Sequence, residues 1–165
     1  MSAVLTNPGV ARVRSALDAA GVASAIVELP GAARTAQAAA AFLGCEVGQI
    51  ANSLVFRGER SGEAVLVMSS GARRVDTGRL AATIGEPVGK ADADFVRERT
   101  GFAIGGVAPV GHATAIRAYV ETSLAAHQEI WAAAGHPHTV FRLTYGELLR
   151  ITGGQAVEVA AEAGS

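Results

Sequence analysis

The chain has 165 residues, 50% of them hydrophobic and 18% charged, with a formal net charge of −1 at pH 7. This length fits one domain that can bury about 70% of its unfolded surface, and the composition excludes an intrinsically disordered protein. A net charge near zero also excludes a protein that depends on a large basic surface to bind nucleic acid, because that mode of binding needs a clear excess of lysine and arginine.

Hydrophobic periodicity and turn residues divide the chain into alternating helices and strands. The predicted helices cover residues 8–20, 35–43, 76–84, 92–101, 122–127 and 145–151. The predicted strands cover residues 25–29, 53–56, 64–69, 115–120, 139–143 and 156–159. Residues 129–133 fit either a continuation of the fifth helix or a further strand. We expect a single mixed α/β domain over residues 1–165.

Some of these helices have clear start signals. Asn7 is a good N-cap, and Pro8 fits the first helical position, where its missing N–H costs nothing. Thr35 is placed to cap the second helix. Thr144 and Glu147 have the spacing of a capping box. The first, second and last helices are therefore predicted to begin at these residues.

No part of the sequence resembles a membrane segment or a secretory leader. The N-terminal residues lack a basic segment followed by an apolar one, and no stretch approaches the roughly 18 apolar residues that cross a bilayer. We therefore expect a cytoplasmic protein without a membrane partner.

The residues that usually carry nucleophilic or metal chemistry are few and scattered. Cys45 precedes Glu46, which would raise the pKa of its thiol, so we expect a buried structural cysteine. The G-x-S-x-G motif of serine hydrolases is absent. His136 and His138 lie in a predicted turn, without an H-E-x-x-H motif or a Cys/His quartet. We predict neither a metal site nor a cofactor.

A glycine-rich, uncharged segment over residues 101–112 is too irregular for a helix. Its central residues are Gly105, Gly106, Val107, Ala108 and Pro109. Glycine allows a ligand to approach the backbone closely and can turn N–H groups outward, whereas proline fixes the exit of the loop. The segment fits a ligand-binding loop or a tight turn packed on the sheet. His112, at its end, fits a loop-bracing hydrogen bond or a substrate contact.

At this loop the sequence resembles the family of YbaK and the prolyl-tRNA synthetase-associated editing domain. The family's G-x-x-x-P loop is matched by residues 105–109, and its usual lead-in by residues 100–102. Residues 50–56 resemble the family's strand after the Ala-rich helix. Later parts of the chain resemble its closing elements, at residues 120–124 and 133–148. The resemblance extends from about Val13 to Val159.

This resemblance implies a compact α/β fold with a mixed, barrel-like sheet flanked by helices. It also implies hydrolysis of the ester that joins a wrong amino acid to the 3′ end of a tRNA, commonly the tRNA for proline. The loop backbone would hold the aminoacyl ester, and water would be the nucleophile with the help of a ribose hydroxyl. A mischarged tRNA end and a prolyl-tRNA synthetase are the implied partners of a monomer that binds no DNA and needs no cofactor.

The chain departs from the family at Asn52, where many members have lysine. An asparagine offers only neutral hydrogen bonds, which are roughly half as strong as those of a charged group. The only lysine, Lys90, falls between two predicted helices. Ser53, Thr35 and Ser69 are further expected substrate contacts. Thr35 also has a sufficient explanation as an N-cap, and Ser69 could equally end its strand.

Two functions from different classes follow from these residues. The first is a trans-editing deacylase in which the residues at 105–109 and Asn52 act on the ester. The second is a non-catalytic module with the editing fold, which holds an aminoacyl-tRNA end, a nucleotide or a synthetase. We favour the first, and the replacement of lysine by Asn52 and the lack of a basic excess motivate the second.

Overall fold

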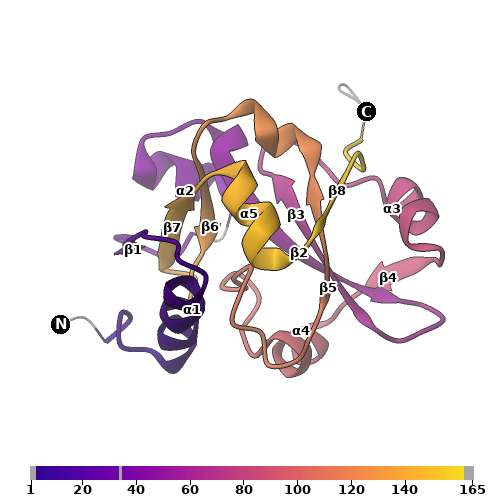
Figure 1. Cartoon of the computed structure of the whole chain (residues 1–165), viewed down its shortest axis with the longest axis horizontal. Helices are drawn as coiled ribbons and strands as arrows, with labels where there is room; N and C mark the ends of the chain where they lie inside the picture. Colours follow the sequence, from indigo (N-terminus) through magenta and orange to yellow (C-terminus); the bar gives the residue numbers. More distant parts are fainter. Residues whose placement is uncertain (1–2, 34, 162–165) are drawn as a thin grey trace.

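The computed structural model describes residues 3–33 and 35–161, which form one mixed 8-stranded sheet with helices on both faces (Figure 1). The strands are β1 (Ile26–Glu28), β2 (Ile50–Gly58), β3 (Ala64–Ser70), β4 (Val88–Lys90), β5 (Arg117–Glu121), β6 (Ile130–Ala133), β7 (Thr139–Leu143) and β8 (Gln155–Val157). The α-helices are α1 (Pro8–Ala19), α2 (Ala36–Leu43), α3 (Thr77–Ile84), α4 (Ala93–Thr100) and α5 (Tyr145–Thr152). Two 3-10 helices, η1 (Val47–Gln49) and η2 (Thr122–Ala126), complete the described elements.

The strand order is β1-β7-β6-β2-β3-β5-β8, and β4 pairs with β2 beside this path. The neighbours β2–β6, β3–β5 and β5–β8 are parallel, and the other pairs are antiparallel. Within the described residues β1 and β8 do not pair with each other, so the sheet remains open. This confirms a mixed α/β domain with a sheet flanked by helices.

Both faces of the sheet are covered, as the burial of β3 shows. Every residue of β3 is buried. Leu66 and Met68 point into the main core, which also contains buried residues of α1 and α5. Val65 and Val67 point the other way and pack against Leu80 of α3. A third cluster lies under α2, and Figure 1 shows α2 beside β6 and β7. A strand covered on both faces needs a continuous apolar run, which β3 has.

The predicted helix starts are confirmed. The side chain of Asn7 accepts a hydrogen bond from the N–H of Gly9, and Pro8 is the first residue of α1. Thr35 caps α2, and Thr144 forms the capping box of α5. The described residues include no helix that is both long and apolar enough to cross a membrane.

Other local predictions need correction. Of the residues left open between helix and strand, 129–133, all but the first form β6, and Ile130 and Ala132 alternate into the core. The short strand β4, with Lys90 at its end, was not predicted. Cys45 is only partly buried, because it follows Gly44, the left-handed residue that ends α2. Burial, with a smaller contribution from the adjacent carboxylate, raises the pKa of the Cys45 thiol.

Candidate functional site

A pocket of about 280 Å³ lies where the central strand β2 has a free edge. One edge of β2 pairs with β3 along residues 51–57. The other edge pairs with β6 at Ile50 and Ala51 and with β4 at residues 56–58. No described strand pairs with this second edge over residues 52–55. The pocket is built around this gap, between α2, the β6–β7 hairpin and the loop that follows α4.

The peptide groups of Ser53 face this gap. The N–H of Gly71 donates to the carbonyl of Ile50 at 2.7 Å, and the N–H of Gly58 donates to the carbonyl of Glu63 at 2.9 Å. Hydrogen-bonded and non-hydrogen-bonded pairs alternate along an antiparallel ladder, so the even-numbered residues of β2 bond to β3. The N–H and C=O of Ser53 consequently point to the open edge and are available to a ligand.

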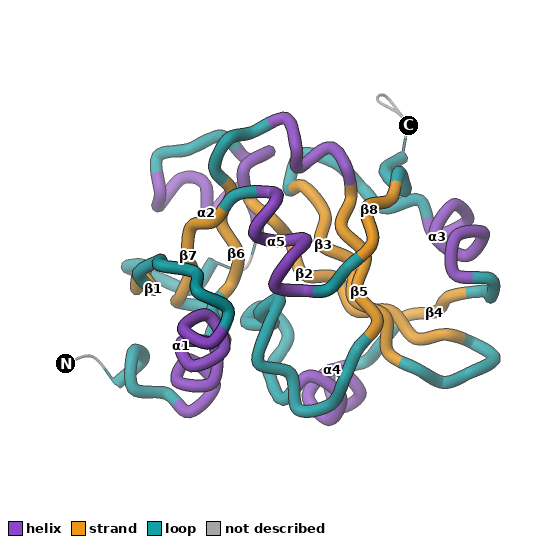
Figure 2. Tube along the Cα trace, viewed as in Figure 1, coloured by secondary structure: helices purple, strands orange, loops and turns teal. Residues whose placement is uncertain are grey.

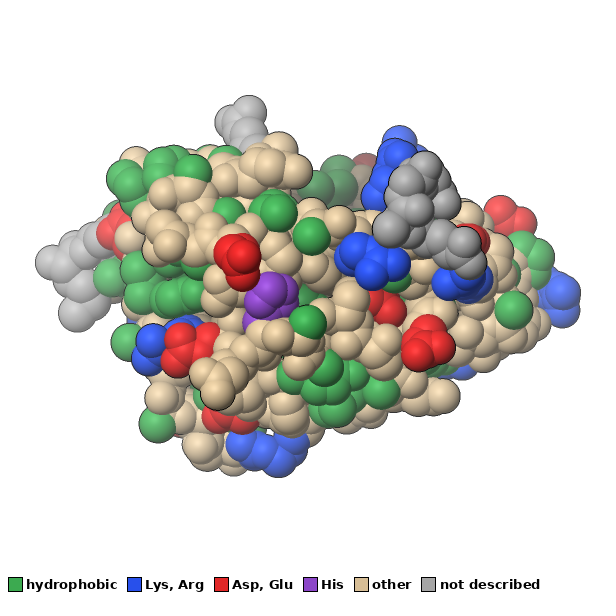
Figure 3. Space-filling view, turned by 90° about the horizontal axis from the view of Figure 1, so that it is seen from above, with side chains coloured by type: hydrophobic (Ala, Val, Ile, Leu, Met, Phe, Trp, Pro, Cys, Tyr) green, Lys and Arg blue, Asp and Glu red, His purple; other side chains and the backbone are tan. Residues whose placement is uncertain are grey.

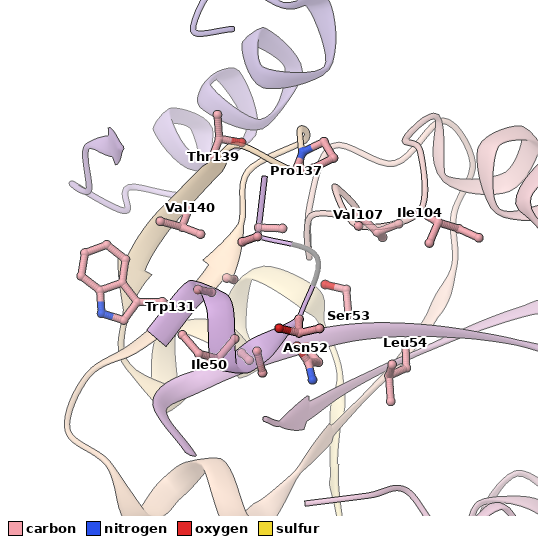
Figure 4. A pocket seen from close by; sticks show the side chains of 18 residues that line it. Ile50, Asn52, Ser53, Leu54, Ile104, Val107, Trp131, Pro137, Thr139 and Val140 are labelled. Atoms are coloured by element: carbon pink, nitrogen blue, oxygen red, sulfur yellow. The ribbon is translucent and has the colours of Figure 1, made fainter. Parts of the chain in front are cut away.

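Side chains on both faces of β2 line the pocket. Figure 4 shows Ser53 on the same side of the strand as Val107 and Pro137, whereas Asn52 and Leu54 point to the other side. Successive residues of a strand alternate in this way. The pocket therefore wraps around the strand edge, and the adjacent motif residues Asn52 and Ser53 serve different parts of it.

The polar side chains among the described lining residues are neutral. The Thr35 hydroxyl accepts a hydrogen bond from the N–H of Ala38 at 3.1 Å, and the Ser53 hydroxyl donates to the Met68 sulfur at 3.4 Å. A thioether is a weak acceptor, so Ser53 keeps most of its bonding capacity. The Asn52 amide makes no hydrogen bond to a described residue. None of the described lining residues is charged.

The glycine-rich segment forms one wall of the pocket, and Figure 2 shows it in the long connection between α4 and β5. We call residues 101–111 the pocket loop. Ile104, Gly105 and Val107 line the pocket, and no described residue accepts a hydrogen bond from the N–H of Gly105 or Val107. Gly105 has a φ of 91°, a left-handed conformation that favours glycine.

The other residues of the predicted motif, Gly106, Ala108 and Pro109, pack against the fold and do not line the pocket. The N–H of Gly106 donates to the carbonyl of Ala103 at 3.0 Å. A Cβ at Gly106 would lie 2.9 Å from the Cα of His136, so only glycine fits there. Ala108 and Pro109 are buried and do not line the pocket. The segment thus combines a pocket wall with a turn packed tightly on the fold.

Two predicted substrate contacts lie outside the pocket. His112 donates from Nε2 to the carbonyl of Ala108 at 2.7 Å, and its ring meets the edge of Phe102, so it braces the loop. Burial lowers the pKa of His112, although the hydrogen bond to Ala108 acts in the opposite direction. Ser69 is 1% exposed, and its hydroxyl has no hydrogen-bond partner in the described structure. It does not reach the pocket.

Several lining residues come from the β6–β7 hairpin, which no local motif marks. They are Trp131, Ala132, Ala133, Pro137, Thr139 and Val140. His136 and His138 lie close by and line an adjoining cavity of about 500 Å³ with Ile104 and Gly105. Their rings are 5.2 Å apart, and burial together with the neighbouring His138 lowers the pKa of His136. Within the described chain no cluster of three or more His, Cys, Asp or Glu side chains could hold a metal ion.

Basic residues do not gather into a stripe on the face seen in Figure 3, where they are interspersed with acidic ones. Arg73 and Arg79 donate to the backbone carbonyls of Ala161 and Ala160 at 2.8 and 2.9 Å. These two arginines hold the C-terminal segment.

The fold and the site define a small α/β domain with a pocket whose described lining residues are uncharged, and its volume of about 280 Å³ lies just below the roughly 300–1,000 Å³ typical of ligand sites. The family model of the aminoacyl-tRNA editing domain matches residues 31–151. The chain belongs to this family. It is 32% identical over 123 residues to the uncharacterized protein YwhH of Bacillus subtilis (strain 168), a match that covers 74% of this chain and 78% of YwhH.

Solved structures agree with this assignment. A proposed trans-editing enzyme for prolyl tRNA synthetase is 46% identical and superposes with a TM-score of 0.88, covering 94% of this chain and 99% of the other. A structure from work on epitope backbone grafting onto scaffold proteins is 43% identical, with a TM-score of 0.89 and the same coverage. Both likenesses extend over nearly the whole domain.

Proposed function

We propose that this protein is a trans-editing aminoacyl-tRNA deacylase that hydrolyses the ester of a mischarged tRNA, with the tRNA for proline as the carrier. The observation that carries the proposal is the pocket at the open edge of β2, which offers backbone N–H groups within small apolar walls. The 46% identical structure described as a proposed trans-editing enzyme for prolyl tRNA synthetase supports the choice of tRNA.

In the proposed reaction the backbone stabilises the charge that develops on the ester carbonyl oxygen. The N–H groups of Gly105, Val107 and Ser53 are the candidate donors, and preorganised donors of this kind stabilise oxyanions strongly in a water-poor site. A water molecule attacks the carbonyl carbon, the bond to the ribose oxygen breaks, and that oxygen takes up a proton. The products are the free amino acid and the uncharged tRNA.

Proton transfer in this scheme depends on the substrate and on water. None of the described residues that line the pocket is a carboxylate, a histidine or a lysine. The vicinal ribose hydroxyl or the amino group of the ester is therefore the natural relay, and the protein contributes orientation and electrostatic stabilisation.

Substrate size would be selected by the apolar wall. Ala36 and Ala39 of α2 and Ala133 and Val140 of the hairpin all line the pocket. A site of about 280 Å³ holds a small aminoacyl group and rejects larger ones by steric clash, which is the logic of a second sieve. We expect alanine, serine or another small residue to be the amino acid that is removed.

The second candidate function is a non-catalytic binding module. The absence of charge among the described lining residues favours it, because Asn52 replaces a lysine that could contact a phosphate or a developing oxyanion. Such a module would hold the aminoacyl-tRNA end without cleaving it.

A deacylation panel distinguishes the two functions. Purified protein is incubated with the tRNA for proline charged with alanine, serine, cysteine, threonine or proline, and ester loss is compared with loss in buffer. Selective loss of one ester identifies an enzyme and its substrate. No loss from any ester, by a folded protein that still binds the charged tRNA, identifies the binding module.

Asn52→Lys is the informative variant in the same panel. If it creates hydrolysis where the natural chain has none, the asparagine is the cause of a lost activity. If the natural chain is already active, a lysine is dispensable at this position. Lys90→Met removes the only natural lysine, which lies in β4 outside the pocket, and serves as a control that leaves hydrolysis unchanged.

A further inference from the structure

The two ends of the pocket loop meet at a narrow neck beside α1. The N–H of Ala113 donates to the carbonyl of Thr100 at 3.0 Å, which closes the neck just outside the loop. Gly101 and Gly111 follow inside it, with φ angles of 81° and 78°. A Cβ at Gly111 would lie 3.4 Å from the backbone of Arg12 in α1, so the loop backbone packs directly on this helix.

Arg12 connects both sides of this neck. Its Nη2 donates to the carbonyl of Gly101 at 2.7 Å, and its Nε donates to the carbonyl of Gly111 at 3.3 Å. The guanidinium carbon lies 4.9 Å from the ring centroid of Phe102, which is 2% exposed. One planar group thus ties the first and last residues of the loop together and stacks on the residue that anchors it in the core.

The same cluster leads to the pocket wall. The Phe102 ring meets the ring of His112, and His112 holds the carbonyl of Ala108. Ala108 follows Val107, whose side chain lines the pocket. No residue of α1 in the described chain lines the pocket, so Arg12 can act on a substrate there only through the loop.

We propose that Arg12 is a positioning residue that sets the geometry of the pocket loop for hydrolysis, an inference that rests on the proposed deacylase function for its catalytic part. The fork of the guanidinium is what the role requires, because it donates along two directions while its face stacks on an aromatic ring. Lysine keeps the charge but is a point donor, and it cannot make all three contacts at once.

The first test measures the loop itself and needs no activity. Hydrogen exchange over residues 102–110 is compared by mass spectrometry in the natural chain, Arg12→Ala and Arg12→Lys. Arg14→Ala is the matched control, because Arg14 is an exposed arginine of the same helix that donates to the carbonyl of Leu5. We expect about tenfold faster loop exchange in both Arg12 variants and none of this change in the control. Unchanged exchange in Arg12→Ala overturns the proposal.

The second test separates positioning from a direct contact between Arg12 and RNA. A positioning role predicts that kcat for the best aminoacyl-tRNA falls about tenfold in both Arg12 variants while KM changes little. A phosphate contact predicts instead a higher KM in Arg12→Ala and a normal KM in Arg12→Lys, and that result would overturn the proposal. Faster loop exchange with unchanged kcat would also refute the catalytic part.

The two tests allow the role of Arg12 to fail or succeed independently of the proposed deacylase function. If the natural chain hydrolyses no aminoacyl-tRNA, the deacylase proposal fails, and the exchange measurement still decides whether Arg12 holds the loop. Should Arg12→Ala not fold, Arg12→Lys supplies the same comparison, because it keeps the charge and the long stem of the side chain.

Discussion

Gly105→Ala tests the pocket loop most directly, because the substitution perturbs the backbone without a steric clash. Gly105 has a φ of 91°, and a Cβ built there would lie 3.7 Å from Cγ of Pro137, an ordinary contact distance. The cost in stability is therefore conformational. A left-handed conformation costs an L-residue about 1–2 kcal/mol, which lowers the unfolding midpoint of a domain of this size by about 2–8 °C.

The expected loss of activity is larger than the loss of stability. If the N–H groups at Gly105 and Val107 bind the oxyanion, a shift in the backbone misaligns them, and removal of one such donor typically costs about 100- to 1,000-fold in kcat. The assay is deacylation of the best substrate from the panel, at a temperature where thermal unfolding shows Gly105→Ala to be fully folded.

Two other glycine variants provide the comparison. Gly146→Ala in α5 meets nothing within 4 Å, and should change neither stability by more than about 1 kcal/mol nor activity. Gly106→Ala forces a Cβ to 2.9 Å from the backbone of His136, so it should destabilise the fold more than Gly105→Ala does. If a folded Gly105→Ala protein hydrolyses every ester at the natural rate, the loop backbone does not contact the reacting group and the mechanism proposed above is wrong.

Three further predictions concern the pocket and its supports. Burial lowers the pKa of His112 from 6.5, so the unfolded chain binds a proton at this histidine more readily than the folded chain does. The free energy of unfolding should therefore fall as the pH is lowered from about 7 to 5. Urea unfolding should show that this fall is smaller in His112→Gln. An identical pH dependence in both proteins would contradict this cause. Ala133→Leu adds volume to the pocket wall and so narrows the pocket. It should lower hydrolysis of a threonyl ester relative to an alanyl ester by about tenfold, measured as the ratio of kcat/KM values. An unchanged ratio would show that this wall does not select substrates by size. Glu121→Gln weakens a 2% exposed carboxylate that accepts a hydrogen bond from the Ser123 N–H at 2.8 Å, and should lower the free energy of unfolding by about 1–3 kcal/mol without changing deacylation by the folded protein. A loss of activity at full stability would show that Glu121 does more than cap η2 at the end of β5.

The elements that the sequence predicts well are those with strong local signals. β7 has the predicted bounds, 139–143, because its mostly buried apolar run lies between a turn and a capping box. β4 was missed because it is a three-residue strand centred on Gly89, and its extended backbone depends on pairing with β2. The 129–133 segment was ambiguous for the same reason, since it becomes a strand through its partners β2 and β7.

The sequence predicts pocket residues only where several of them lie in one continuous segment. The G-x-x-x-P loop and residues 52–53 are continuous motifs, and the structure brings Gly105, Val107, Asn52 and Ser53 to one pocket. The other lining residues could not be predicted, because they are far from these motifs in the sequence. Trp131 and Thr139 reach the pocket because β6 pairs with β2 and then turns away from it, a consequence of tertiary pairing.

Two residues that are adjacent in the sequence can also serve different parts of the site, because side chains alternate between the two faces of β2. Asn52 and Ser53 are neighbours in the motif, yet their side chains leave β2 on opposite faces (Figure 4). A lysine at position 52 would start from the face away from Val107 and would have to extend its flexible stem around the edge to approach the loop. The backbone groups of Ser53 need no such reach, because the strand itself presents them to the gap between β6 and β4. A lysine at position 52 would thus place a mobile charge at the rim of the pocket, whereas the donors on which the proposed chemistry depends are fixed in the backbone.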